Sequence, residues 1–222
     1  MIMKSISSFN KIFCSFFLFI AALLIFRILY AGSTRYLFMG WNLFLAWIPY
    51  ALSSFFRQYQ LSQKWKQAVL FMSWLLFFPN ALYIVTDFVH LQYDSDMPWW
   101  YDAVLLFASS FMGIVLAFIS LRRAEVYLQG LFSPRQVNFL MAFILFLGSF
   151  GVYLGRFQRW NSWDVLHNPV SLAMDILTKM INPLDNYKVW AITILFTAIY
   201  SLLYYFIRLL PQALAETKNT DS

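Results

Sequence analysis

Six long apolar runs dominate this chain and constrain its fold more than any other feature. They cover residues 12–30, 36–56, 68–85, 103–121, 137–155 and 189–207. Each is close to the roughly 20 residues that a helix needs to cross about 30 Å of hydrocarbon. None has the alternating pattern of a barrel strand, so the prediction is an all-α, polytopic transmembrane bundle of six helices, a single integral membrane domain over residues 1–222. Only Arg27 places a charge inside a run, near its end, where its side chain is expected to snorkel to the interface.

Composition excludes an ordinary soluble domain. Hydrophobic residues make up 61% of the chain and charged residues only 12%, whereas soluble proteins carry about 25% charged residues. The net charge of +6 comes from basic residues scattered at the ends of the runs. A nucleic-acid partner is therefore not predicted, because there is no dense basic cluster. Membrane lipid is the expected surrounding partner.

The distribution of Lys and Arg predicts the orientation in the cell (cytoplasmic) membrane. One set of connections and the two termini hold most of the basic residues: Lys4, Lys11, Arg57, Lys64, Lys66, Arg122, Arg123, Arg135, Arg208 and Lys218. The positive-inside rule places both termini in the cytoplasm. The acidic connection that contains Asp87, Asp94, Asp96 and Asp102 is then outside the cell.

The connection before the last run predicts an additional helix over about residues 169–181. Asn168 and Pro169 form a helix-start signal, and apolar residues then recur at helical spacing. Asp175 and Lys179 are an i,i+4 pair on the polar side. We expect an amphipathic helix that lies on the outer membrane surface.

Polar residues gather on one predicted helix face at the end of the third run. At about 100° per residue, five side chains fall within roughly an 80° arc: Asn80, Tyr83, Asp87, His90 and Asp94. Charged groups at a membrane span are costly unless partnered, which makes this face a functional-site hypothesis. Asp87 and His90 form a candidate acid/base pair, with Asn80 and Tyr83 as substrate contacts. The alternative is structural, with Asp87 paired to an arginine, of which Arg156 and Arg159 are nearest by depth.

A second polar group follows the fifth run. If that helix continues, Arg156, Arg159, Trp163 and His167 share a face. Two guanidinium groups at headgroup level can bind phosphate or carboxylate, or contact lipid phosphates. Arg156, Arg159 and Trp163 are therefore candidate substrate-binding residues. Asn161 to Asp164 also resembles a helix N-cap with an acid at the third position.

No cofactor and no metal is predicted. Asp94, Asp96 and His167 are available as further ligands beside Asp87 and His90, but no spacing signature specifies a metal site. There is no phosphate-binding glycine loop, nucleophile elbow or zinc-protease motif.

Two sequence strings resemble a known bacterial family. They are Phe78-Pro-Asn-Ala-Leu-Tyr-Ile-Val-Thr-Asp-Phe-Val-His90 and Tyr153-Leu-Gly-Arg-Phe-Gln-Arg-Trp-Asn-Ser-Trp-Asp164. Together with the strings at 41–50 and 100–102, they are similar to those of the membrane family catalogued as domain of unknown function 1361. The resemblance implies a multi-pass membrane protein of bacterial type and supplies no activity or catalytic residue.

Three functions fit these patterns. The first is binding or transport of a small anionic or lipid-linked solute, with Arg156 and Arg159 holding the anion and Asp87 and His90 coupling protons. The second is a membrane enzyme acting on a lipid or lipid-linked substrate at the outer leaflet, with Asp87 and His90 as acid and base. The third is a non-catalytic membrane assembly subunit. Transport has one feature against it, because the inner half shows no matching polar pathway. Whether the protein is an enzyme stays open at this point.

Overall fold

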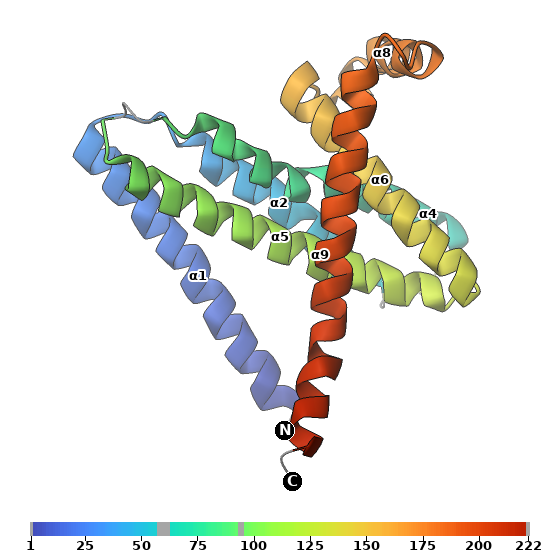
Figure 1. The fold of residues 1–222 in the computed structure, drawn as a ribbon, viewed down its shortest axis with the longest axis horizontal. Helices are drawn as coiled ribbons and strands as arrows, with labels where there is room; N and C mark the ends of the chain where they lie inside the picture. The colour runs from blue at the N-terminus through green and yellow to red at the C-terminus, as the bar shows by residue number, and fades with distance from the viewer. Residues whose placement is uncertain (1, 57–62, 93–95, 221–222) are drawn as a thin grey trace. The chain divides into compact units, whose positions relative to one another are not determined.

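The computed structural model describes residues 2–56, 63–92 and 96–220. These residues form helices and their connections, as the sequence predicts (Figure 1). The elements are α1 (Ile2–Ala31), α2 (Phe38–Ser54), α4 (Lys64–Tyr83), the 3-10 helix η1 (Ile84–His90), α5 (Trp99–Gln129), α6 (Pro134–Gln158), α7 (Asp164–His167), α8 (Pro169–Ile181) and α9 (Tyr187–Thr220).

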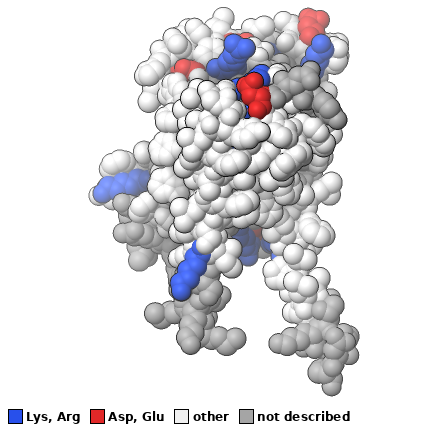
Figure 2. Space-filling model, turned by 90° about the vertical axis from the view of Figure 1, so that its left-hand side faces the viewer, with Lys and Arg blue, Asp and Glu red and all other residues white. Residues whose placement is uncertain are grey.

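Five of the six predicted spans form helices that are long and apolar enough to cross a membrane. They are Asn10–Ala31, Lys64–His90, Trp99–Gln129, Pro134–Gln158 and Tyr187–Ala215. The remaining run forms α2, whose 17 residues are shorter than these five. Large apolar side chains on the long helices point outward; Leu18 and Phe139 are each 70% exposed. Much of the surface in Figure 2 carries no charged side chain. A surface of this kind requires lipid, so the chain is a multi-pass integral membrane protein.

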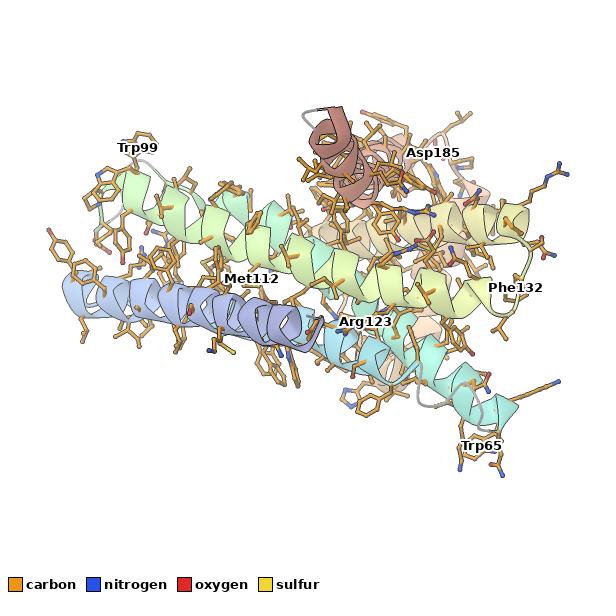
Figure 3. The ribbon with its side chains drawn as sticks, turned by 90° about the horizontal axis from the view of Figure 1, so that it is seen from below. Trp65, Trp99, Met112, Arg123, Phe132 and Asp185 are labelled. Carbon is orange, nitrogen blue, oxygen red and sulfur yellow. The ribbon has the colours of Figure 1, made fainter. Side chains whose placement is uncertain are left out.

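The chain divides into two compact units, Met1–Arg123 and Ala124–Ser222, called unit 1 and unit 2 here. In unit 1, α2 packs against α4. Trp74 and Phe78 of α4 are fully buried, and the Trp74 ring packs edge-on against Phe56 and tilted against Phe71. Figure 3 shows the two ends of this unit, with Trp99 at the start of α5 and Trp65 at the start of α4. We call them the Trp99 end and the Trp65 end.

The third predicted span does not continue as one α-helix to residue 94. The α-helix ends at Tyr83, and Ile84–His90 is a 3-10 helix. Two hydroxyl groups bond the backbone at this change: Thr86 donates to the carbonyl of Tyr83 at 2.6 Å and Ser110 to that of Ile84 at 3.1 Å. Gly113 of α5 lies so close that a Cβ there would be 2.9 Å from the Ala81 carbonyl oxygen. The periodicity of the sequence carries no information on these contacts with α5. The prediction that one α-helix continues to residue 94 was therefore wrong.

In unit 2, α6 packs against α9. Ser133 and Gln136 form a capping box at the start of α6, and Pro134 occupies its first turn. The helix ends at Gln158, because Arg159 adopts a left-handed conformation with φ 61°. A small core of Tyr153, Leu154 and Val189 lies near this end.

Helix α8 has the predicted bounds but not the predicted orientation of its faces. Leu172 and Ile176 pack against the Tyr153 core, and Lys179 on the same side is only 4% exposed. An exposed apolar stripe lies on the other side, formed by Val170, Met174, Leu177 and Ile181. Asp175 and Lys179 form the predicted i,i+4 pair, but they do so against the protein. Asn168 stands at the N-cap, but its side chain makes no capping hydrogen bond.

Candidate functional site

A buried ion pair lies at the Trp99 end of unit 1. The Arg27 guanidinium binds the Asp102 carboxylate with both arms, Nε to Oδ1 at 2.7 Å and Nη2 to Oδ2 at 3.2 Å. Both side chains are 0% exposed. Arg27 therefore does not snorkel to the interface, because a carboxylate on α5 neutralises it inside the unit. The sequence analysis missed this pair, since the two residues are 75 positions apart.

Tyr36, in the connection before α2, links this ion pair to η1. Its ring lies 4.0 Å from the Arg27 guanidinium carbon, which is a cation–π distance. Its hydroxyl donates a 2.8 Å hydrogen bond to the carbonyl of His90. Tyr36 is 1% exposed. One side chain thus contacts both the buried arginine and the backbone of the candidate acid/base pair.

Asp87 is closed off from the surface. It is 1% exposed, and its Oδ2 accepts a 2.8 Å hydrogen bond from the Asn42 side chain of α2. Asn42 was not among the predicted site residues, although it lies in one of the strings that resemble the family. A buried carboxylate depends on such partners, and the expected pairing of Asp87 with Arg156 or Arg159 stays a prediction. Its contact with Asn42 binds η1 to α2.

His90 follows Asp87 by one turn of η1 but is exposed. In a 3-10 helix, residues i and i+3 lie on the same side. The imidazole contacts the Phe38 ring, with 4.8 Å between ring centroids. The two members of the predicted acid/base pair thus lie one turn apart, the carboxylate buried and the imidazole exposed.

The other predicted residues of this face lie in α4 or beyond η1. Asn80 and Tyr83 are half-buried in the last turn of α4. Asp94 lies outside the described residues. Within the described residues, no group of three or more His, Cys, Asp or Glu side chains gathers as metal ligands would.

The arginines of the second predicted group lie at the end of α6 in unit 2. Arg156 is half-buried, and Arg159 is exposed. Because α6 ends before Arg159, the expectation that these residues share one helix face with Trp163 and His167 was wrong. Asn161 and Asp164 form the predicted local turn, in which the Asn161 N–H donates to the Asp164 carboxylate at 2.7 Å.

Asp175 ties α8 to this end of α6. It accepts a 2.9 Å hydrogen bond from the Trp160 indole and forms an ion pair with Lys179. Burial opposes its ionisation, but the bonds from Lys179 and Trp160 and the charge of Lys179 outweigh burial. They hold the pKa of the Asp175 carboxyl below its ordinary value. Local structure therefore accounts for Asp175 without a ligand.

Unit 2 also contains a buried carboxylate that the sequence analysis did not select. Glu125, near the end of α5, is 0% exposed. It accepts a 2.5 Å hydrogen bond from the Tyr204 hydroxyl and lies 2.9 Å from Arg208 Nη2. Glu125 lies beyond the predicted run 103–121, and its partners are on α9.

Comparisons with known proteins identify a family and nothing finer. The model of the family described as "Protein of unknown function (DUF1361)" matches residues 41–203. The match covers α2 from residue 41, then α4, η1, α5, α6, α7, α8 and α9 to residue 203, and with them Asn42, Asp87, Asp102 and Arg156. No curated protein and no solved structure matches the chain. More than half of the chain is matched, so this multi-pass membrane protein belongs to the DUF1361 family, as the resemblance implied.

Proposed function

We propose that this protein binds or transports a small anionic or lipid-linked solute, and that Asp87 and His90 couple protons to that binding. The observation that carries the proposal is the contrast in exposure between the two residues. Asp87 is a buried carboxylate, and the imidazole of His90, one 3-10 turn away, is exposed. In this arrangement Asp87 can receive its proton from solvent through His90. Asn42 supports the carboxylate in this state by donating a hydrogen bond to it.

The same contrast disfavours the enzyme alternative. A carboxylate that acts directly on a lipid substrate must reach the substrate's reacting atoms at hydrogen-bond distance. Asp87 is 1% exposed, and the nearby Arg27 and Asp102 are both 0% exposed. Catalysis by these groups would require the Trp99 end of unit 1 to open first.

Arg156 and Arg159 are the proposed anion contacts, with Trp163 beside them in sequence. Support comes from their chemistry and partial accessibility, because guanidinium groups bind phosphate and carboxylate with two hydrogen bonds. Asn80 and Tyr83 are the proposed solute contacts in unit 1. Both are half-buried in the turn of α4 that precedes η1.

A non-catalytic assembly role is the second candidate. The observation in its favour is that the buried charges already have protein partners: Arg27 with Asp102, and Glu125 with Tyr204 and Arg208. A network of this kind stabilises packing without any ligand. The two candidates predict different responses to anions.

Melting temperatures in detergent separate them. The probes are inorganic phosphate, succinate and a short-chain phosphatidic acid, each at acidic and at neutral pH. A ligand at 100 times its Kd stabilises the folded state by about 2.7 kcal/mol. At least one probe should stabilise the wild type, and Arg156→Gln and Arg159→Gln should remove most of that effect. Lys188→Gln, an exposed cation of the same unit, is the matched control.

The proton-coupling role is tested by the pH dependence of that stabilisation. His90→Asn should abolish the dependence while leaving the melting temperature without ligand nearly unchanged, since Asn cannot carry the proton. His167→Asn changes the other exposed histidine and should have no effect. Stabilisation that depends on pH equally in the wild type and in His90→Asn contradicts the coupling role. Absence of stabilisation by all three probes favours the assembly role.

A further inference from the structure

An open apolar groove lies at the Trp65 end of unit 1, between the end of α2 and the first turns of α4. Its volume is about 350 Å³. Leu52 of α2 and Phe55 directly after it line one side, and Trp65, Lys66, Val69, Leu70 and Ser73 line it from α4. From Trp65 to Ser73 the helix rises about 12 Å. The groove thus extends from the polar start of α4 into its apolar part.

The polar end of the groove carries an exposed cation beside an exposed indole. Trp65 is 62% exposed, and its Nε1 donates to Gln63 at 2.8 Å. Lys66 is exposed, with its Nζ 5.6 Å from the centre of the Trp65 ring. A tryptophan and a lysine together are typical of the level where lipid headgroups meet the hydrocarbon.

The charge at this end of unit 1 has one sign. Residues 1–86 contain no Asp or Glu, and the acidic residues of unit 1 all lie between positions 87 and 102 of the sequence. Asp87 and Asp102, which the structure describes, lie toward the Trp99 end. Lys66, in the first turn of α4, is the cation that lines the groove. The rim of the groove is therefore complementary to an anion, while its floor is complementary to an acyl chain.

We propose that this groove is a binding site for an anionic phospholipid. The acyl chain lies along Phe55, Val69 and Leu70, and the headgroup phosphate pairs with Lys66. Zwitterionic lipids fill the same groove with their chains but gain no net charge attraction. The site does not depend on the proposed function, because none of its residues belongs to the Asp87 and His90 group or to unit 2.

Fluorescence quenching in nanodiscs tests the proposal. Brominated phosphatidylglycerol and brominated phosphatidylcholine quench indoles that they contact. Trp65 is one of nine tryptophans, so its signal is the difference between the wild type and Trp65→Phe. At equal mole fraction, the anionic lipid should associate about five-fold more strongly with Trp65 than the zwitterionic lipid.

Charge variants make the test specific to the groove. Lys66→Gln should remove the preference, so that phosphatidylglycerol and phosphatidylcholine associate with Trp65 about equally. Lys66→Arg should retain the preference for phosphatidylglycerol. Lys64→Gln is the matched control, because Lys64 is an exposed lysine of the same turn that does not line the groove. Equal quenching by the two lipids in the wild type overturns the proposal, as does absence of quenching specific to Trp65. A preference that survives Lys66→Gln, or that Lys64→Gln removes to the same extent, also overturns it.

Discussion

At the scale of single residues, burial separates the charges that hold the protein together from those that face lipid headgroups or water. Arg27, Asp87, Asp102 and Glu125 are each 1% exposed or less. Arg35, by contrast, is exposed and hydrogen-bonded to Gln92 at 2.6 Å. A buried charge loses its hydration and depends on its partner, whereas an exposed charge keeps water around it.

The Arg27–Asp102 pair yields a prediction at this scale. Asp102→Asn keeps the shape of the side chain but leaves Arg27 charged and buried without a counterion. We expect it to destabilise the folded state by about 3–5 kcal/mol. The double variant Arg27→Met/Asp102→Leu should recover most of that loss, because it removes both charges.

Thermal unfolding in detergent measures these changes, with Arg35→Met as the control for losing an exposed cation. If Asp102→Asn melts at the same temperature as Arg35→Met, the pair is not a dry ion pair. If the double variant melts no higher than Asp102→Asn, the two side chains stabilise the fold by more than neutralising each other's charge.

At the scale of helices, the change from α4 to η1 positions the candidate site. The 3-10 helix brings Asp87 against Asn42 and the His90 carbonyl against Tyr36. α5 supports this arrangement by close packing, because Gly113 lies against Ala81 and Ile84. The site thus depends on the contact between α4 and α5 at a residue that carries no functional group.

Gly113→Ala tests that dependence. A Cβ at Gly113 would lie 2.9 Å from the Ala81 carbonyl oxygen and 3.3 Å from the Ile84 side chain, so the helices must separate. Overpacking of this kind costs about 1–3 kcal/mol. Gly40→Ala is the matched control, because a Cβ there meets only Leu24 at an ordinary 3.8 Å. Its higher helix propensity should make that variant neutral or more stable by up to about 1 kcal/mol.

Melting temperatures of the two variants should therefore move in different directions. Hydrogen exchange of Ile84–His90 should also rise in Gly113→Ala alone. Equal shifts in melting temperature in both variants would mean that α5 can move away from α4 at little cost. The glycine at position 113 would then not be required for this contact.

At the scale of the whole molecule, the chain is a set of membrane helices with apolar side chains facing lipid. If all six apolar runs cross the membrane, each connection is expected on the side opposite to the one before it. Lys and Arg concentrate on one set of connections. The positive-inside rule then predicts cytoplasmic termini and an external Asp96 connection.

Reporter fusions test this orientation. Fusions after Lys66 and Gln129 should be active with a cytoplasmic reporter, and a fusion after Asp96 with a periplasmic one. A fusion after Asp185, between α8 and α9, serves as a second external point (Figure 3). The reverse pattern would place the Asp87 group on the cytoplasmic side and contradict the predicted topology.

Local sequence by itself determined the membrane class, five long apolar helices, the bounds of α8 and the Asp175–Lys179 pair. The physical reason is that hydropathy over about 20 residues and i,i+4 spacing are properties of one segment. It also selected Asp87 and His90, because charges at the end of a span are rare and costly. The local sequence pattern did not predict that α6 ends before Arg159, nor that the α-helix changes to the 3-10 helix η1 at Ile84.

Only the tertiary structure decided which buried groups neutralise or bond one another. Arg27 and Asp102 are separated by 75 residues, Asn42 and Asp87 by 45, and Glu125 and Tyr204 by 79. Each partner is an ordinary polar residue within or beside an apolar run, and hydropathy cannot show which helix it will face. The same holds for α8, where packing against Tyr153 turned Lys179 inward and left the apolar stripe exposed. Pairing between helices depends on how they pack, because a charge in an apolar setting persists only where the fold brings a partner to it.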